Sequence, residues 1–139
     1  MRRKAREAAL QALFQIDVGK AAAHEAVAYA INLNDLSGET EEFCRSLVDG
    51  VVANRDSIDA TIERLAIDWS LSRLGNVDRN VLRMALFELV YRQDIPVGVT
   101  INEAVEVAKT FGNSESGRFI NGILGRFARE NLGEIEGER

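Results

Sequence analysis

Apolar residues recur at every third or fourth position through almost the whole chain, which is the spacing of helices that bury one face. In the first segment Ala5, Ala8 and Ala12 lie on such a stripe, and Gly19 marks its end. Alternation with a period of two, which indicates a strand, occurs only around residues 97–101 and is too short for a sheet. The pattern therefore predicts an all-α chain. Further helices are expected at about residues 21–33, 39–53, 55–66, 77–92, 100–111 and 115–131.

Polar residues predict how two of these helices begin. Asn76 is expected to cap the fifth helix. Thr100 and Glu103 have the spacing of a capping box at the start of the sixth helix. The fifth helix carries apolar residues on most sides, so we expect it to lie near the centre of the molecule.

The chain shows no repeat and no linker that would divide it. We expect one helical domain over residues 1–131 and a flexible tail at 132–139, which has little to bury. Residues 68–74 form no regular pattern, and Trp69 and Leu71 are expected to plug an end of the bundle there.

The formal net charge of the 139-residue chain is −5, but the charges are unevenly distributed. The first six residues hold four cations and no acid, whereas residues 39–63 hold seven acids and two arginines. A basic pole on an acidic body can contact phosphates locally while the rest of the surface avoids polyanions. The acidic stretch should face away from such a contact, or face a basic protein partner.

The cysteine count and the N-terminal residues indicate the cellular compartment of the protein. Cys44 is the single cysteine, so no disulfide can form within the chain, which fits a reducing environment. The basic start is not followed by the apolar run of a signal peptide, and no window approaches the length of a membrane span. We therefore expect a cytoplasmic protein that does not enter a membrane.

Residues that could carry catalysis or bind a metal are scattered. His24 is the single histidine and lies in an alanine-rich segment, and Cys44 has no second cysteine with which to share a metal. Carboxylates such as Glu103 and Glu106 lie one helical turn apart, which is common on solvated faces. We expect no enzymatic activity, no cofactor and no metal.

The basic start is the first positive signal for nucleic acid. Arg2 and Arg6 share a helical face, with Arg3 and Lys4 beside them. Arginine forks bind phosphate oxygens and stack on unpaired bases. Cations at a helix N-terminus oppose the helix dipole, which favours a role other than helix stability. The alternative is a solvated, frayed helix start.

The second signal is the stretch at residues 109–122, which mixes aromatic, basic, amide and small residues. Phe111 and Phe119 can stack on single-stranded bases, and the start of the last helix offers free N–H groups to a phosphate. Glycine inside a helix costs ~1 kcal/mol relative to alanine, and two glycines of the last helix lie between two arginines. Alternatively, the glycines admit a neighbouring helix and the phenylalanines belong to the core. These two arginines and two glycines, which lie on one stripe of the last helix, are Arg118, Gly122, Gly125 and Arg129.

Five blocks of the chain carry motifs that occur in a fixed order: residues 2–14, 43–51, 76–89, 95–112 and 118–124. They include RRKARE with ALQALF, FCRSLVDGV, NVDRNVLRMALFEL, INEA with VAKTFG, and RFINGIL. Each block alone is weak, whereas the five in order are specific. Together they resemble the NusB family of bacterial antitermination factors over about residues 2–128.

The resemblance implies a compact bundle of about seven helices in two closely packed subdomains. It implies a protein that binds boxA, a single-stranded element of ribosomal RNA leaders, together with the ribosomal protein NusE in the RNA polymerase antitermination complex. It also implies no catalysis and no metal, and some family members form homodimers. With the patterns above, the expected RNA-binding residues are Arg2, Arg3, Lys4, Arg6, Phe14, Lys109, Phe111, Gly112, Ser116, Arg118, Phe119 and Asn121.

The resemblance also suggests where a protein partner binds. Asp78 takes the place of an acidic residue that faces NusE in the family, and Arg79 and Arg83 are expected in the same interface. Phe14 stands where the family often has tyrosine, so it brings no hydroxyl group.

The leading hypothesis is that the basic start and the turn at residues 109–121 meet in space as one RNA-binding face. Arginine–phosphate contacts would make the affinity salt-dependent, and stacking would supply discrimination. A second hypothesis is a protein-only helical adaptor whose basic start contacts an acidic protein. A third is the NusB-like domain of an RNA methyltransferase, whose catalytic part would then lie on another chain because no cofactor-binding βαβ pattern follows.

Overall fold

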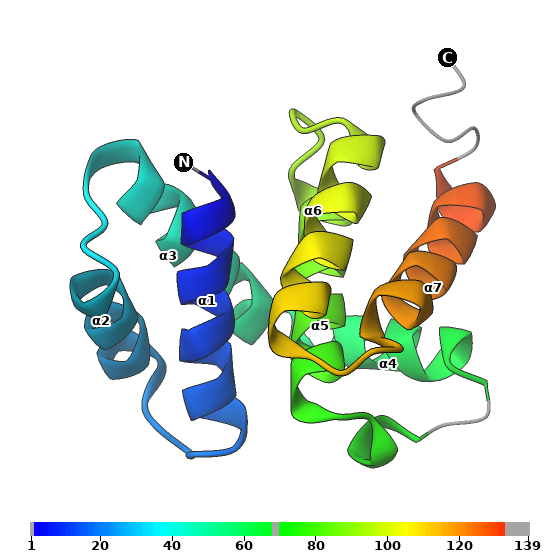
Figure 1. The fold of residues 1–139 in the computed structure, drawn as a ribbon, viewed down its shortest axis with the longest axis horizontal. Helices are drawn as coiled ribbons and strands as arrows, with labels where there is room; N and C mark the ends of the chain where they lie inside the picture. Colours follow the sequence, from blue (N-terminus) through cyan, green and yellow to red (C-terminus); the bar gives the residue numbers. More distant parts are fainter. Residues whose placement is uncertain (1, 68–69, 133–139) are drawn as a thin grey trace.

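The computed structural model describes residues 2–67 and 70–132, and in these ranges the regular structure is helical (Figure 1). The predicted all-α fold is confirmed, and each helix starts and ends within a few residues of the predicted bounds. The α-helices are α1 (Arg2–Asp17), α2 (Ala23–Leu33), α3 (Gly38–Ala53), α4 (Arg55–Leu65), α5 (Asn76–Tyr91), α6 (Val97–Phe111) and α7 (Ser116–Asn131), with a short 3-10 helix η1 (Leu71–Arg73) before α5.

The helices pack as two groups that meet along α5. Helices α1, α2 and α3 form the group on the left of Figure 1, and α4 to α7 form the group on the right. Helix α5 contacts α1 and α3 across the boundary as well as the three other helices of its own group. Every residue from 79 to 89 is therefore buried, which confirms the central position predicted for this helix.

Small residues allow α1 to approach its neighbours closely. Ala5, Ala8 and Ala9 are completely buried, and the helix packs against both α2 and α3 through this alanine face. A single apolar core continues from here into the second group. The two subdomains are thus closely packed, as the resemblance implied.

The two predicted helix caps are not formed, although both helices begin close to their predicted starts. Helix α5 begins at Asn76 itself, preceded by Gly75, and the Asn76 side chain accepts a hydrogen bond from Arg79 instead of capping the helix. Helix α6 begins at Val97, directly after Pro96, whose fixed φ and missing N–H suit a helix start. The expected capping box of residues 100–103 therefore lies inside the helix.

Some predictions concern residues outside the described ranges. Trp69 is one of them, and of the expected tail only Leu132 is described. Leu71 is partly buried against the core, as predicted. Across residues 2–67 and 70–132, none of the helices has the length and apolar character needed to cross a membrane.

Candidate nucleic-acid interface

The first turn of α1 presents two cations that form no ion pair within the described residues. Arg2 and Lys4 are exposed, and neither forms an ion pair with any residue of the described chain. The Arg2 guanidinium lies over the ring of Phe43 on α3, 4.5 Å from its centroid. Such a contact restrains the side chain through the ring face and leaves its N–H donors unused. Both side chains are therefore available to a phosphate.

Arg3 is exposed as well, but it is held by α6. Its Nε and Nη2 each donate to a carboxylate oxygen of Glu103 at 2.8 Å, which is the bidentate geometry of a strong ion pair. The hydrogen bond from Arg3 holds the pKa of Glu103 below its ordinary value. One edge of the guanidinium is engaged in this way, and the Nη1 edge remains free to bind a second acceptor.

Arg6 was predicted to contact RNA, but its side chain does not lie at the surface as that prediction requires. Arg6 is 2% exposed, and its guanidinium donates to both oxygens of the buried Glu88 on α5, at 2.8 and 2.7 Å. Thr100 on α6 donates to the same carboxylate at 3.2 Å. The physical reason is that position 6 lies on the apolar face of α1 with Ala9 and Leu13, three and seven residues later. Arg6 therefore joins the two subdomains.

Helices α1 and α6 meet along a seam that begins at the Arg3–Glu103 pair. At its opposite end, two aromatic side chains line one pocket. Phe14 on α1 is 38% exposed and Phe111 on α6 is 41% exposed. Both line a mainly apolar pocket of about 210 Å³, which is also lined by Gln15 and by Asn76 and Val77 at the start of α5. Such a pocket between two partly exposed rings can accept a planar apolar group, and amide side chains at its edge can donate or accept hydrogen bonds.

The turn between α6 and α7 is built around Ser116, which was predicted to contact RNA and is 1% exposed. Its Oγ accepts a hydrogen bond from the Asn113 backbone N–H at 3.0 Å. Gly112 is required beside it, because a Cβ there would overlap Ser116 Oγ and lie 2.8 Å from the Ala108 carbonyl oxygen. The Ser116 hydroxyl therefore shapes the turn, and that prediction is wrong.

The remaining predicted residues of this stretch are spread over different sides of the turn. Lys109 and Arg118 are exposed, with Lys109 3.4 Å from Glu106 and Arg118 3.8 Å from Glu115. Phe119 is half-buried and lines a separate pocket toward α5. Asn121 is exposed and lines a groove between α6 and α7. Phe111 is thus the member of the stretch that joins Phe14 on the α1 side.

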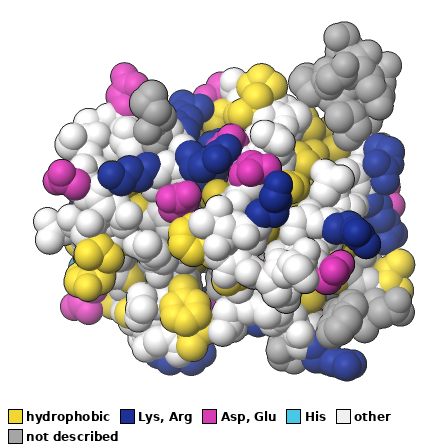
Figure 2. Space-filling view, viewed as in Figure 1, with side chains coloured by type: hydrophobic (Ala, Val, Ile, Leu, Met, Phe, Trp, Pro, Cys, Tyr) yellow, Lys and Arg dark blue, Asp and Glu magenta, His cyan; other side chains and the backbone are white. Residues whose placement is uncertain are grey.

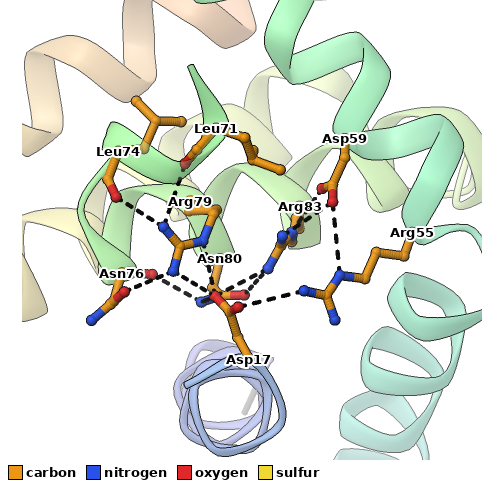
Figure 3. Close-up of polar contacts among 9 residues, drawn as sticks. All are labelled: Asp17, Arg55, Asp59, Leu71, Leu74, Asn76, Arg79, Asn80 and Arg83. Carbon is orange, nitrogen blue, oxygen red and sulfur yellow. Dashed lines mark hydrogen bonds and ion pairs between the residues drawn. The ribbon is translucent and has the colours of Figure 1, made fainter. Parts of the chain in front are cut away.

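Arg79 and Arg83 were predicted to face a protein partner, but they are buried in an ionic cluster of their own (Figure 3). Both lie close to the carboxylate of Asp17 at the end of α1, at 2.7 and 3.2 Å. Arg83 also donates to both oxygens of Asp59 on α4. The prediction is therefore wrong for these two residues, because their donors are used within the chain.

Burial and hydrogen bonding have opposite effects on the pKa of Asp17. Burial alone would raise the pKa of its carboxyl, but hydrogen bonds from Arg79 and Asn80 bring the pKa below its ordinary value. The carboxylate therefore stays ionised and links α1 to α5. Sequence reasoning missed this cluster, although polar residues at positions 76, 79, 80 and 83 form one stripe on a helix that is otherwise apolar.

Asp78, by contrast, points toward a pocket. The side chain is partly buried, and its Oδ1 has no hydrogen-bond partner within the described chain. It lines a cavity of about 300 Å³ together with Asn113, Glu115 and Phe119. A carboxylate oxygen without a donor at the wall of a cavity can accept a hydrogen bond from a bound molecule.

The model of the NusB family matches residues 3–129 of this chain. The chain belongs to the NusB family. The transcription antitermination protein NusB of Heliobacterium modesticaldum is 51% identical over 138 residues, which cover 99% of this chain and 66% of that protein. The chain thus spans about two thirds of the length of this relative.

Solved NusB structures have the same fold. The structure of T. maritima NusB aligns with a TM-score of 0.90 and 38% identity, and the alignment covers 100% of this chain and 98% of that one. A crystal structure of the antitermination factors NusB and NusE in complex with double-stranded RNA contains a chain with a TM-score of 0.85 and 27% identity, covering 93% of this chain and 96% of that one. The similarity to solved structures therefore agrees with the family membership of the chain.

Figure 2 shows the face of this NusB-family chain that carries α1, α6 and α7. Basic side chains lie over α1 and over α7, with acidic ones between them, and hydrophobic side chains lie over the lower part of α1. Residues 2–67 and 70–132 contain no group of histidine, cysteine and acidic side chains that could hold a metal ion. Cations and aromatic rings along one seam are thus the chemistry that this face offers.

Proposed function

We propose that this protein is a non-catalytic, cytoplasmic RNA-binding antitermination factor. It binds single-stranded boxA-type leader RNA of ribosomal RNA operons together with the ribosomal protein NusE, as part of the RNA polymerase antitermination complex. The observation that carries this proposal is the seam between α1 and α6. One end of the seam displays Arg2, Arg3 and Lys4, and the other holds Phe14 and Phe111 around a pocket.

The two ends of the seam have different roles. Arg2, Arg3 and Lys4 bind phosphate oxygens, which supplies affinity and makes it depend on salt. Phe14 and Phe111 stack on unpaired bases, which restricts binding to RNA whose bases can leave a helix. Arg6, Arg79, Arg83 and Ser116 take no part in RNA or partner contacts, because their polar groups are satisfied inside the fold.

The likeness to a NusB chain that was solved with NusE and RNA supports a shared interface with the ribosomal protein. In this chain we assign the partner contact to Asp78, whose Oδ1 accepts no hydrogen bond from the described residues. Ribosomal proteins are rich in cations that can supply such a donor. Duplex RNA offers no unpaired base to Phe14 and Phe111, so single-stranded RNA is the proposed target.

Fluorescence polarisation with a labelled single-stranded boxA RNA tests the proposal, with and without NusE. We expect the parent protein to bind this RNA more tightly than a duplex of the same sequence, and more tightly again when NusE is present. The double variant Arg3→Gln with Lys4→Gln should lose affinity. Two cations away from the seam, Arg45 on α3 and Arg64 on α4, provide a control: Arg45→Gln with Arg64→Gln makes the same change of charge.

A protein-only adaptor predicts a different result in the same titration. NusE would bind the chain, but boxA RNA would bind neither the chain nor the complex better than it binds NusE alone. Equal loss of affinity in the Arg3 and Lys4 variant and in the control variant would likewise contradict the assignment of the RNA site to α1.

A further inference from the structure

A groove of about 380 Å³ lies between α6 and α7, on the side of α6 away from α1. No carboxylate is among the residues that line it, although the chain as a whole carries a net charge of −5. Its polar lining consists of Asn102 on α6 and of Asn121 and Arg129 on α7. In an acidic protein, a groove walled by amides and a guanidinium is suited to an acceptor-rich ligand.

The donors in this groove are not used by the fold. Asn102, Asn121 and Arg129 are exposed, and none of them forms a side-chain hydrogen bond or an ion pair within the described chain. Arg129 lines the groove beside Gly125, with its Nη1 3.3 Å from the position of a Cβ on that glycine. This differs from Arg126 on the same helix, which is paired with Glu130 at 2.9 Å.

Packing inside the protein does not explain why glycine stands at position 122. A Cβ added there would have open space around it, with no heavy atom of another element within 4 Å. The alternative drawn from the sequence, in which this glycine admits a neighbouring helix, is therefore wrong for Gly122. Glycine nevertheless costs the helix ~1 kcal/mol relative to alanine. A bare backbone at this point lets a ligand approach α7 closely.

We propose that this groove binds the sugar–phosphate backbone of RNA that continues beyond the seam between α1 and α6. The inference rests on the proposed RNA-binding function and extends its site. Helix α6 lies between the seam and the groove on one face of the molecule (Figure 1), so a strand that crosses α6 passes from one to the other, beside the acidic side chains that lie between α1 and α7 (Figure 2). Arg129 binds a phosphate, and Asn102 and Asn121 donate to phosphate or ribose oxygens.

Charge complementarity favours RNA over a second protein as the occupant. The side chains of the groove offer donors and a positive charge without a carboxylate to pair with a partner's lysines. Figure 2 shows basic side chains over α7. A polyanion satisfies all of these donors at once, whereas a protein helix would leave several of them unpaired.

The test compares two labelled single-stranded RNAs, the boxA core alone and the same core with flanking leader nucleotides on both sides. Gly122→Leu fills the groove, and Arg129→Gln removes its cation. Ala28→Leu on the exposed face of α2 and Arg45→Gln on α3 are the matched controls. Thermal unfolding of each variant shows whether the fold is intact.

Gly122→Leu should weaken binding of the extended RNA about tenfold, a loss near 1.4 kcal/mol, and leave binding of the core unchanged. Its melting temperature should stay the same or rise, because leucine favours a helix more than glycine does. Arg129→Gln should lower the slope of log affinity against log salt by about 0.7 for the extended RNA alone.

Extended-RNA affinities equal to the parent's in both groove variants would overturn the inference, even if core binding confirmed the proposed function. Loss of NusE binding in these variants, with RNA binding unchanged, would also overturn it and assign the groove to a protein. If the parent failed to bind the core RNA at all, the proposed function itself would fail, which this design separates from failure of the groove.

Discussion

Replacing Arg6 should destabilise the fold far more than it affects RNA contacts. The Arg6 guanidinium and the Glu88 carboxylate form two hydrogen bonds at 2.8 and 2.7 Å, and both side chains are at most 3% exposed. Arg6→Ala removes one partner and leaves a buried carboxylate without its cation. Breaking a buried pair in this way costs about 3–5 kcal/mol. A domain of this size has a total free energy of unfolding of about 5–15 kcal/mol, so the loss is a large fraction of it.

Urea unfolding followed by circular dichroism measures this loss. The double variant Arg6→Met with Glu88→Leu should recover most of the stability, because replacing both members of a buried pair by apolar groups is often nearly neutral. Thr100 would then lose the acceptor that it has at 3.2 Å, so recovery should be incomplete. The double variant should also keep the salt dependence of RNA binding shown by the parent, because Arg6 contacts no phosphate.

Two results would refute this reasoning. A loss of unfolding free energy below about 1 kcal/mol for Arg6→Ala would mean that the pair is not buried as described. A fall of about 0.7 in the salt slope of RNA binding for the stable double variant would mean that Arg6 does contact a phosphate.

Three further predictions concern other parts of the molecule. The depressed pKa of Asp17 stabilises the fold at pH values above its unfolded pKa of about 4, and this contribution is lost as the pH falls through the folded pKa. Asp17→Asn should therefore be less stable than the parent at neutral pH, and thermal melts should show the difference shrinking in acid; an unchanged difference would contradict the link. Gly50→Ala should cost about 1–3 kcal/mol in chemical unfolding, because its Cβ would overlap the ring of Phe87, whereas Gly98→Ala should be neutral or stabilising; equal effects would refute the packing described. Phe14→Ala and Phe111→Ala should each weaken boxA binding by about 1–3 kcal/mol without loss of helicity, and unchanged polarisation titrations would rule out stacking.

The sequence predicts the helices well because their apolar spacing is regular and each helix buries one face. The central position of α5 also follows from its apolar pattern, and residues 79–89 are indeed buried. Helix starts are harder to predict because several residues compete for that role. Thr100 and Glu103 match a capping box, yet tertiary partners on α5 and α1 engage their side chains inside the helix.

The site could be predicted in part. Arg2, Arg3 and Lys4 are exposed, and Phe14 and Phe111 line one pocket. The wrong predictions of site residues share a cause. In each case a charged or hydroxyl side chain was expected at the surface, although its position lies on a buried helix face. Arg6, Arg79, Arg83 and Ser116 are such residues. The three arginines bind carboxylates that are distant in the sequence, whereas Ser116 binds Asn113 within its own turn.

A titration of the isotope-labelled protein with single-stranded boxA RNA, followed by NMR, tests most directly whether α1 and α6 form the RNA-binding face. The backbone amide signals of the first turn of α1, of Phe14 and of Phe111 should shift together as RNA is added, while the outward-facing residues of α2 and α4 stay unchanged. Shifts confined to α2, α3 and α4, or no shifts at all, would contradict it.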